Sequence, residues 1–371
     1  MNNGAAPSPG LRPEDAAMSN HPLYEKLCDY RILRISYGQA LKGKRKYRKE
    51  AIVFDMARER NLVELWRMLK NETYRPGEYI QFEVTEPKRR RVSAPRIRDK
   101  IIQFAVHLVL WDIYEPVFIK DTFACLDERG THRAVDRVQH YMRQCKWQHG
   151  DCWIIKGDVR KFFYRIDREL LKKLLRKKIK DEKFIRLLDL ILDSSPEGDT
   201  GIPLGNVTSQ DFANIYLNEL DQFVKRRLGI KFYVRYMDDF IIMLPSKQEA
   251  QRILAEVDAF VQTHMRLELN EKTSIFPVEQ GVNAYGFKIY TTHTLARNAS
   301  KAAAKRRIKA MDRKYRAGEV PLKDVVQSVN SWLGHARHSN SFNLATKIYA
   351  PYDYITVKHK KYRFGVKPVT H

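Results

Sequence analysis

The chain has 371 residues, 43% of them hydrophobic, and 68 Lys and Arg against 44 Asp and Glu give it a net charge of +24. This composition excludes a disordered protein and allows two or three packed units, while the charge indicates a polyanionic partner, for which nucleic acid is the default. No uncharged apolar run is long enough to span a bilayer and no lipidation signal is present, so we expect no membrane association and a cytoplasmic location.

The cysteines argue against a structural metal or disulfide framework. Cys28, Cys125, Cys145 and Cys152 are scattered, and no C-x-x-C pair occurs. Neither a zinc ribbon nor a disulfide-stabilised scaffold is therefore indicated, and reduced thiols fit the expected cytoplasmic location.

The N-terminal third is predicted to be mainly helical. Residues 1–22 lack the order of a secretory signal and are expected to form a flexible tail. Apolar spacings of three and four predict helices over Tyr24–Lys70, and helical periodicity returns over Arg98–Tyr114. Between them, EYIQFEVTEPKRRRVSAP alternates apolar and polar residues, which predicts a two-stranded ribbon with a basic turn at Pro87–Arg90.

The central segment mixes strands and helices. WIIKGDV, beginning at Trp153, predicts a strand, and SIFPV and AYGFKIY predict further short strands. The predicted helices run from Arg168 to about Leu192, from Thr208 to about Leu228 and from Ser246 to about Met265. This order predicts an α+β domain with helices packed on an antiparallel sheet.

The last 75 residues, Arg297–His371, carry 17 Lys and Arg against four Asp and Glu, so that +13 of the net +24 lies there. The segment reads as helix, with a break at Gly318–Pro321. Such a basic helical end suits a phosphate backbone. His335 and His338 lie three apart with no further ligand type nearby, so we expect packing or RNA contacts rather than metal binding.

The stretch KFYVRYMDDFIIML places two adjacent carboxylates between β-prone runs, which predicts a hairpin with Asp238 and Asp239 at its turn. An isolated Asp-Asp pair is usually only a turn, but two-residue hairpins favour a glycine that is missing here, and neighbouring carboxylates repel. Asp158 closes the apolar strand WIIKGD, and in a shared sheet it would meet the pair at one edge. Three such carboxylates could hold two Mg²⁺ ions about 3.5 to 4 Å apart.

Five blocks, WIIKGDVRKFF, GIPLGNVTSQDFANIYLNELD, YMDD, LNEKT and AYGF, resemble in order and spacing the blocks of reverse transcriptases, from about Pro76 to Tyr349. The resemblance implies an RNA-directed DNA polymerase with the right-hand fold: tail 1–22, fingers 23–150, palm 151–295, and a basic helical thumb with C-terminal tail, 296–371. It also implies that Asp158, Val159, Asp238 and Asp239 hold two Mg²⁺ ions, for which Mn²⁺ is a substitute.

The resemblance implies further roles, each with a simpler alternative. Phe163 matches the steric gate against a ribose 2′-hydroxyl, whereas Phe162 is expected in the core. Lys88 and Arg91 match residues that grip the triphosphate, or else lie on a solvated turn. Lys272 matches a proposed general acid, or is a surface lysine. The residues that match the primer grip are Tyr285, Gly286 and Phe287.

GIPLGNVTSQ departs from the Gln-Gly-x-x-x-Ser-Pro pattern of many reverse transcriptases at both ends. Leu204 replaces the first Gln and Gln210 replaces the Pro, with Gly205 kept, and all three are expected near the deoxynucleotide. This variation is similar to that of diversity-generating retroelements, which copy template adenines with low fidelity. Loss of an amide removes hydrogen bonds that could position the nucleotide, although Leu204 could be only a packing variant.

The expected partners are a template RNA, its RNA–DNA duplex, deoxynucleotides and, by resemblance, a small basic accessory protein. A group II intron protein would continue into a maturase region, retron signatures such as NAxxH are missing, and no room remains for RNase H. A defence-associated reverse transcriptase acting on a noncoding RNA is the nearest alternative. A non-catalytic RNA-binding protein would have lost a metal ligand, and Phe163 with YMDD disfavours an RNA-dependent RNA polymerase.

Overall fold

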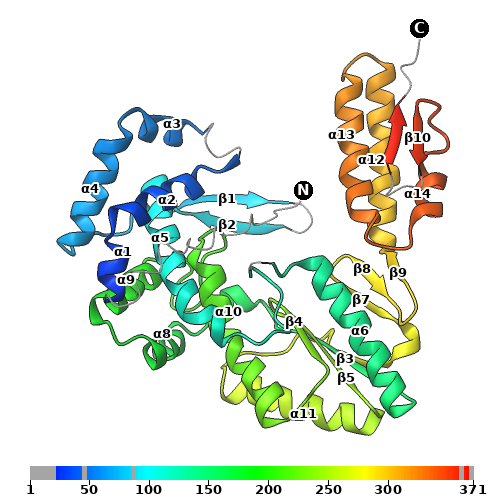
Figure 1. The fold of residues 1–371 in the computed structure, drawn as a ribbon, viewed down its shortest axis with the longest axis horizontal. Coiled ribbons are helices and arrows are strands. Elements are labelled where there is room, and N and C mark those ends of the chain that lie inside the picture. The colour runs from blue at the N-terminus through cyan, green and yellow to red at the C-terminus, as the bar shows by residue number, and fades with distance from the viewer. Residues whose placement is uncertain (1–21, 44–47, 86–88, 127, 359–362, 367–371) are drawn as a thin grey trace.

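The core of the computed structural model, which describes residues 22–43, 48–85, 89–126, 128–358 and 363–366, is a four-stranded antiparallel sheet (Figure 1). Its strands, in spatial order, are β4 (Tyr233–Tyr236), β5 (Asp239–Leu244), β3 (Trp153–Asp158) and β6 (Ser274–Pro277). The predicted strand is β3, and the predicted hairpin is formed by β4 and β5, which pair on one side of it. This arrangement confirms the α+β prediction.

Helices cover both faces of this sheet because its strands alternate buried residues between two cores. Ile155 and Phe240 belong to the core under α11 (Lys247–Thr263), whereas Ile154 and Ile241 belong to the core under α6 (Thr131–His149). At Gly157 the chain needs glycine, since a Cβ there would lie 2.1 Å from the Phe240 ring of the neighbouring strand. The helix α6 packs on the sheet, although it lies within residues 23–150, which the resemblance assigns to the fingers.

The N-terminal helices form a lobe beside the sheet (Figure 1). They are α1 (Leu23–Leu27), α2 (Tyr30–Ala40), α3 (Lys49–Met56), α4 (Arg58–Lys70) and α5 (Ile97–Tyr114), followed by a 3-10 turn at Glu115–Val117. The predicted ribbon is confirmed, with β1 (Ile80–Val84) antiparallel to β2 (Arg90–Ala94). α5 lies against α2 and α10 (Thr208–Gln222), which explains why it is apolar on most of its surface.

The prediction of one helix from Arg168 to about Leu192 is wrong. Two helices occur, α8 (Arg168–Lys178) and α9 (Glu182–Asp193), because Ile179 is extended and the Asp181 carboxylate accepts bonds from the amides of Lys183 and Phe184. The other helices of this region are α7 (Phe162–Arg165) and α10 (Thr208–Gln222), which continues into a π-helical turn at Phe223–Arg227.

The C-terminal lobe stands on a second sheet, of β7 (Val282–Ala284), β8 (Phe287–Ile289) and β9 (Thr294–Ala296), which a 3-10 turn at Val278–Gln280 precedes. Its helices are α12 (Asn298–Arg316), α13 (Leu322–Ala336) and α14 (Phe342–Tyr349), packed around their own core. The break at Gly318 is confirmed. The all-helical prediction fails at the end, where β10 (Ile355–Lys358) pairs with β11 (Arg363–Val366), since a short two-stranded pair leaves too few residues for a clear periodicity.

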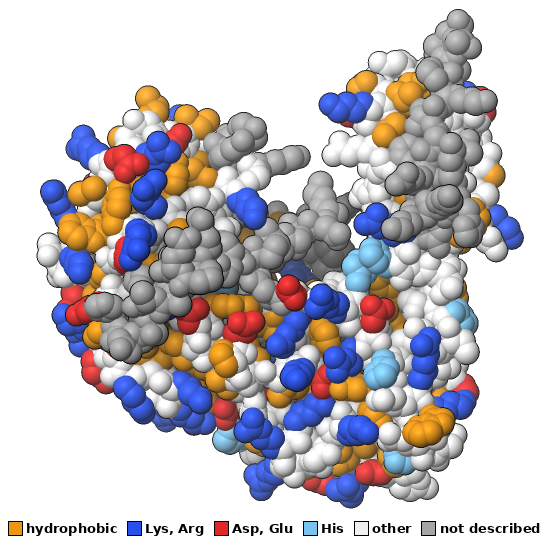
Figure 2. Space-filling model, in the orientation of Figure 1, with side chains coloured by type: hydrophobic (Ala, Val, Ile, Leu, Met, Phe, Trp, Pro, Cys, Tyr) orange, Lys and Arg blue, Asp and Glu red, His pale blue; other side chains and the backbone are white. Residues whose placement is uncertain are grey.

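Figure 2 shows the surface hollowed between the N-terminal and C-terminal lobes, with Lys and Arg side chains along the lower border of the hollow. The four cysteines form no disulfide in the structure, and Cys28, Cys145 and Cys152 are buried. Among the helices of the described residues, none combines the length and apolarity needed to span a membrane.

Stacked rings join the C-terminal lobe to α6 and β8. The rings of His132 and His338 lie 3.4 Å apart and nearly parallel, and those of Phe287 and His335 lie 4.3 Å apart. The His335 ring also lies over Gly286, where an added Cβ would approach it to 3.0 Å. Both histidines are therefore packing residues: His335 holds α13 against the turn between β7 and β8, and His338, just after α13, packs against α6.

This junction should weaken in acid. Burial lowers the pKa of His132 from 6.5 to about 4, and the charges of His338, His335 and Arg337 add to the shift. Burial likewise lowers the pKa of His335 and His338, the latter opposed by Asp136. Because the folded state favours the neutral rings, the stability that they contribute is present above pH 6.5 and is lost as pH falls toward 4.

The variant His132→Phe keeps a stacked ring but removes the titrating group. We therefore expect its melting temperature to fall less than that of the wild type when the pH is lowered from 6.5 to 4. Differential scanning calorimetry measures this, with His140→Phe, on the exposed side of the same helix, as the control. An equal acid-induced loss in wild type and His132→Phe would contradict the assignment.

Candidate active site

The hairpin of β4 and β5 has a turn different from the one predicted. Tyr236 pairs with Asp239, so the two turn residues are Met237 and Asp238, and Asp239 is the first residue of β5. Met237 has a φ of 54°, a left-handed backbone conformation that is uncommon for residues other than glycine, asparagine and aspartate. The predicted turn at Asp238 and Asp239 is thus shifted by one residue.

The register of the sheet brings the third carboxylate to this hairpin. Asp158 is the last residue of β3 and pairs directly with Asp239 in the antiparallel ladder. The next residue, the buried Val159, donates its amide proton to the carbonyl of Asp238 at 3.3 Å. The expectation that Asp158 meets the hairpin at one edge is confirmed as geometry, and the metal-binding roles remain predictions.

Asn270 orients Asp158, and the sequence analysis missed it. The backbone amide of Asn270 donates to the backbone carbonyl of Asp158 at 2.7 Å, and its side-chain Nδ2 donates to the Asp158 carboxylate at 3.0 Å. Its Oδ1 accepts the amide proton of Lys272 at 3.1 Å, while the Lys272 residue is exposed. The only signal for this role was its place in the LNEKT block, because a single carboxamide in a loop has no periodicity.

The carboxylates disfavour one another's charge. Burial, followed by the charges of Asp158 and Asp239, raises the pKa of Asp238 to about 7, against the opposing charge of Arg90. Such a set of oxygen donors fits a hard divalent cation, Mg²⁺ or Mn²⁺, which would relieve the repulsion. Within the described ranges, no three Asp, Glu, His or Cys side chains already converge as metal ligands, so the three share an edge without forming a closed cage.

The loop that contains Leu204 ties the ribbon to the segment after β3. The carbonyl of Phe163 accepts the amide proton of Ile202 at 2.8 Å, and the carbonyl of Leu204 accepts that of Ser93 on β2 at 3.0 Å. Phe163 and Leu204 are half-buried, whereas Phe162 is in the core, as expected. Both candidate pocket residues are therefore held by backbone bonds of one loop.

Gly205 cannot be replaced without strain. Its φ is 132°, and a Cβ there would lie 2.6 Å from the carbonyl oxygen of Ser93. On the ribbon, Arg91 is exposed, bonds Gln81 through its guanidinium, and accepts a bond from the Tyr164 hydroxyl at its carbonyl. Gln210 is exposed on the first turn of α10. Lys88 lies outside the described residues.

The predicted primer grip forms the turn between β7 and β8, with Tyr285 and Gly286 in left-handed conformations and Phe287 buried. The rings of Tyr285 and Tyr236 lie 5.0 Å apart, so this turn reaches the hairpin. Burial, followed by the charge of Asp239, raises the pKa of Tyr285 well above its usual value. Its buried hydroxyl has no hydrogen-bond partner among the described residues.

Comparisons with known proteins agree with this geometry. Residues 83–289, more than half of the chain, match the family described as "Reverse transcriptase (RNA-dependent DNA polymerase)". The chain is 26% identical to Protein YkfC of Escherichia coli over 61% of its length and 68% of that protein's length. It is 27% identical to the group II intron-encoded protein LtrA of Lactococcus lactis, over 62% of its own length and only 50% of LtrA's length.

Among solved structures, an apo telomerase from Candida tropicalis matches with a TM-score of 0.49 and 12% identity, over 74% of this chain and 59% of that one. So distant a likeness adds nothing to the family match. The fold and the family match define a polymerase of the right-hand class. The chain belongs to the reverse transcriptase family, and the predicted enzyme class, RNA-directed DNA polymerase, is the activity for which that family is described.

Asp238→Asn should stabilise the metal-free protein, because it removes one of three mutually repelling charges from a half-buried edge. At pH 8 in a chelator, we expect a higher melting temperature, equivalent to about 1 kcal/mol. Asp199→Asn, in an exposed loop, is the control. Mn²⁺ should raise the melting temperature of the wild type more than that of Asp238→Asn. A destabilised Asp238→Asn, or equal Mn²⁺ effects, would contradict the charge assignment.

Proposed function

We propose that this chain is an RNA-directed DNA polymerase that copies a specific structured RNA with low fidelity at template adenines. The observation that carries the polymerase proposal is the register that pairs Asp158 with Asp239 and leaves Asp238 beside them at the turn. Family membership supports the same chemistry. The mutagenic role is the finer part of the proposal and rests on Leu204.

At the carboxylate edge, Asp158, Asp238 and Asp239, with the main chain at Val159, would hold two divalent ions. When bound, such ions lower the pKa of the primer 3′-hydroxyl and stabilise the leaving pyrophosphate. Asn270 keeps the Asp158 carboxylate in place by its bond to Oδ2. The 3′-oxygen forms a bond to the α-phosphorus of the deoxynucleotide, the bond to pyrophosphate breaks, and a proton returns to pyrophosphate.

Lys272 is the proposed proton donor for that last step, and Arg91, with Lys88, is proposed to bind the triphosphate. Arg91 supports this role by lying exposed on the ribbon, where a planar guanidinium can bond two phosphate oxygens. Phe163 is proposed to exclude ribonucleotides, since the backbone bond from Ile202 fixes its position. Tyr285, Gly286 and Phe287 are proposed to hold the primer end next to Asp239.

Leu204 supports the low-fidelity proposal. Its carbonyl is bonded to Ser93, and the tight packing of Gly205 against the same Ser93 leaves little freedom for this loop. The side chain therefore stands at a fixed place with no donor or acceptor to offer a base or sugar. A site that lacks such a bond discriminates weakly between nucleotides.

The proposed partners are a template RNA, its duplex with the product DNA, and deoxynucleotides. The exposed Lys and Arg side chains of α12 suit the duplex backbone. A small basic accessory protein remains a prediction from resemblance.

Similarity to LtrA favours a second candidate, an intron-type reverse transcriptase. An accurate enzyme would fit that role, whereas errors confined to template adenines would fit diversification. A defence role on a noncoding RNA would also go with faithful copying. Fidelity therefore separates the first proposal from both alternatives.

Primer extension on a defined RNA template with Mg²⁺ and four deoxynucleotides tests the polymerase proposal. Asp238→Ala/Asp239→Ala should reduce the rate by about a thousandfold or more while leaving the binding of primer–template intact. Gel-shift titration of the same protein samples is the control. Undiminished extension by the variant, or none by the wild type with its own RNA present, would overturn the proposal.

Leu204→Gln should lower misincorporation opposite template adenine by about tenfold and change the correct incorporation rate less. Sequencing of the products measures both. Leu204→Met, which keeps an apolar side chain of similar size, is the matched control and should stay error-prone. If both variants changed fidelity equally, packing rather than hydrogen bonding would be the cause.

A further inference from the structure

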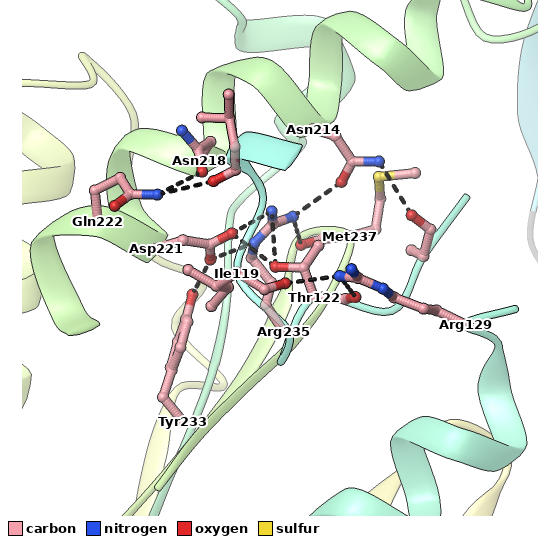
Figure 3. Close-up of polar contacts among 12 residues, drawn as sticks. Ile119, Thr122, Arg129, Asn214, Asn218, Asp221, Gln222, Tyr233, Arg235 and Met237 are labelled. Carbon is pink, nitrogen blue, oxygen red and sulfur yellow. Dashed lines mark hydrogen bonds and ion pairs between the residues drawn. The ribbon is translucent and has the colours of Figure 1, made fainter. Parts of the chain in front are cut away.

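A fully buried ion pair lies behind the hairpin (Figure 3). The side chains of Arg235, on β4, and Asp221, on α10, are each 0% exposed. Arg235 Nη2 donates to Asp221 Oδ2 at 2.6 Å, and Arg235 Nε donates to Asp221 Oδ1 at 2.7 Å. The two planar groups therefore meet through two parallel bonds, the strongest geometry for such a pair.

The remaining nitrogen of this guanidinium reaches the catalytic turn. Arg235 Nη1 donates to the carbonyl oxygen of Met237 at 3.2 Å and to Asn214 Oδ1 at 3.3 Å. Met237 is the residue in the left-handed conformation, and its carbonyl belongs to the peptide that leads into Asp238. Arg235 thus holds the orientation of the peptide plane from which the Asp238 carboxylate projects.

The pair is itself held from two other sides (Figure 3). Tyr233 donates its hydroxyl proton to Asp221 Oδ1, and Thr122 donates to Asp221 Oδ2, both at 2.7 Å. The backbone of Arg235 is also bonded in both directions, its amide to the Asp121 carbonyl and its carbonyl to the Phe123 amide. The guanidinium therefore has little freedom to move away from the turn.

Replacing a buried ion pair with well-packed neutral side chains is often neutral or stabilising, whereas removing one partner is costly. An apolar replacement, however, could not donate to the Met237 carbonyl.

Resting on the proposed function, we propose that Arg235 and Asp221 are positioning residues of the active site. Their task is to hold the Met237–Asp238 peptide so that the Asp238 carboxylate stays in register with Asp158 and Asp239. Neither residue touches the substrate. The pair is the counterpart, on the hairpin side, of the bond from Asn270 to Asp158.

Three variants test this. Arg235→Lys keeps the charge, but a single ammonium cannot serve both Asp221 oxygens and the Met237 carbonyl. Asp221→Asn/Arg235→Met removes both charges and leaves an amide to accept the Tyr233 hydroxyl. Arg176→Lys makes the same exchange in an exposed ion pair, that of Arg176 on α8 with Asp189 on α9, and is the matched control.

Single-turnover incorporation should slow by about 10- to 100-fold in Arg235→Lys and in the double variant, while the Kd values for deoxynucleotide and primer–template change by less than about twofold. Arg176→Lys should keep the wild-type rate. Melting temperatures, expected near the wild-type value for the double variant, separate slow chemistry from misfolding. A double variant that folds and incorporates at the wild-type rate would overturn the proposal.

A second readout needs no activity. Mn²⁺ binding, followed by electron paramagnetic resonance of the free ion, should weaken by about tenfold in Arg235→Lys and be unchanged in Arg176→Lys. Asp238→Ala defines complete loss of the site. If the wild type were inactive, the proposed function would be refuted, but the Mn²⁺ titration would still test whether Arg235 positions the carboxylates. Equal Mn²⁺ affinity in wild type and Arg235→Lys would refute the positioning role.

Discussion

Repulsion among Asp158, Asp238 and Asp239 is the constraint around which the centre of this molecule is built. Burial and the neighbouring charges raise the pKa of Asp238 to about 7, so the charged form of this edge is unfavourable by itself. Sites of this kind are maintained by surrounding structure rather than by their own contacts. The surrounding side chains and the sheet must therefore hold the three carboxylates together.

Two separate sets of hydrogen bonds, one on each strand, hold the carboxylates in place. On the β3 side, Asn270 bonds both the backbone and the carboxylate of Asp158. On the hairpin side, the buried Arg235 and Asp221 hold the turn through the Met237 carbonyl. Apolar cores on both faces of the sheet keep the two strands in register between these supports. A change in either support should displace one carboxylate without unfolding the sheet.

The sequence predicted the carboxylate edge well because it depends on local patterns. Asp158 ends an apolar strand, and Asp239 lies in an equally clear hairpin, so their convergence followed from strand pairing. The turn was misplaced because the left-handed Met237 is stabilised by Arg235, a contact that no periodicity reveals. Asn270 was missed for the same reason, since a loop carboxamide acquires its role only from tertiary structure.

A crystal of the complex with primer–template RNA, grown with Mn²⁺ and an unreactive deoxynucleotide analogue, would test the whole arrangement. The anomalous scattering of Mn²⁺ locates the ions directly. We expect peaks bounded by the carboxylates of Asp158, Asp238 and Asp239, with the Arg235 guanidinium still bonded to the Met237 carbonyl. Peaks elsewhere, or a hairpin whose turn had left Arg235, would contradict this description of the active site.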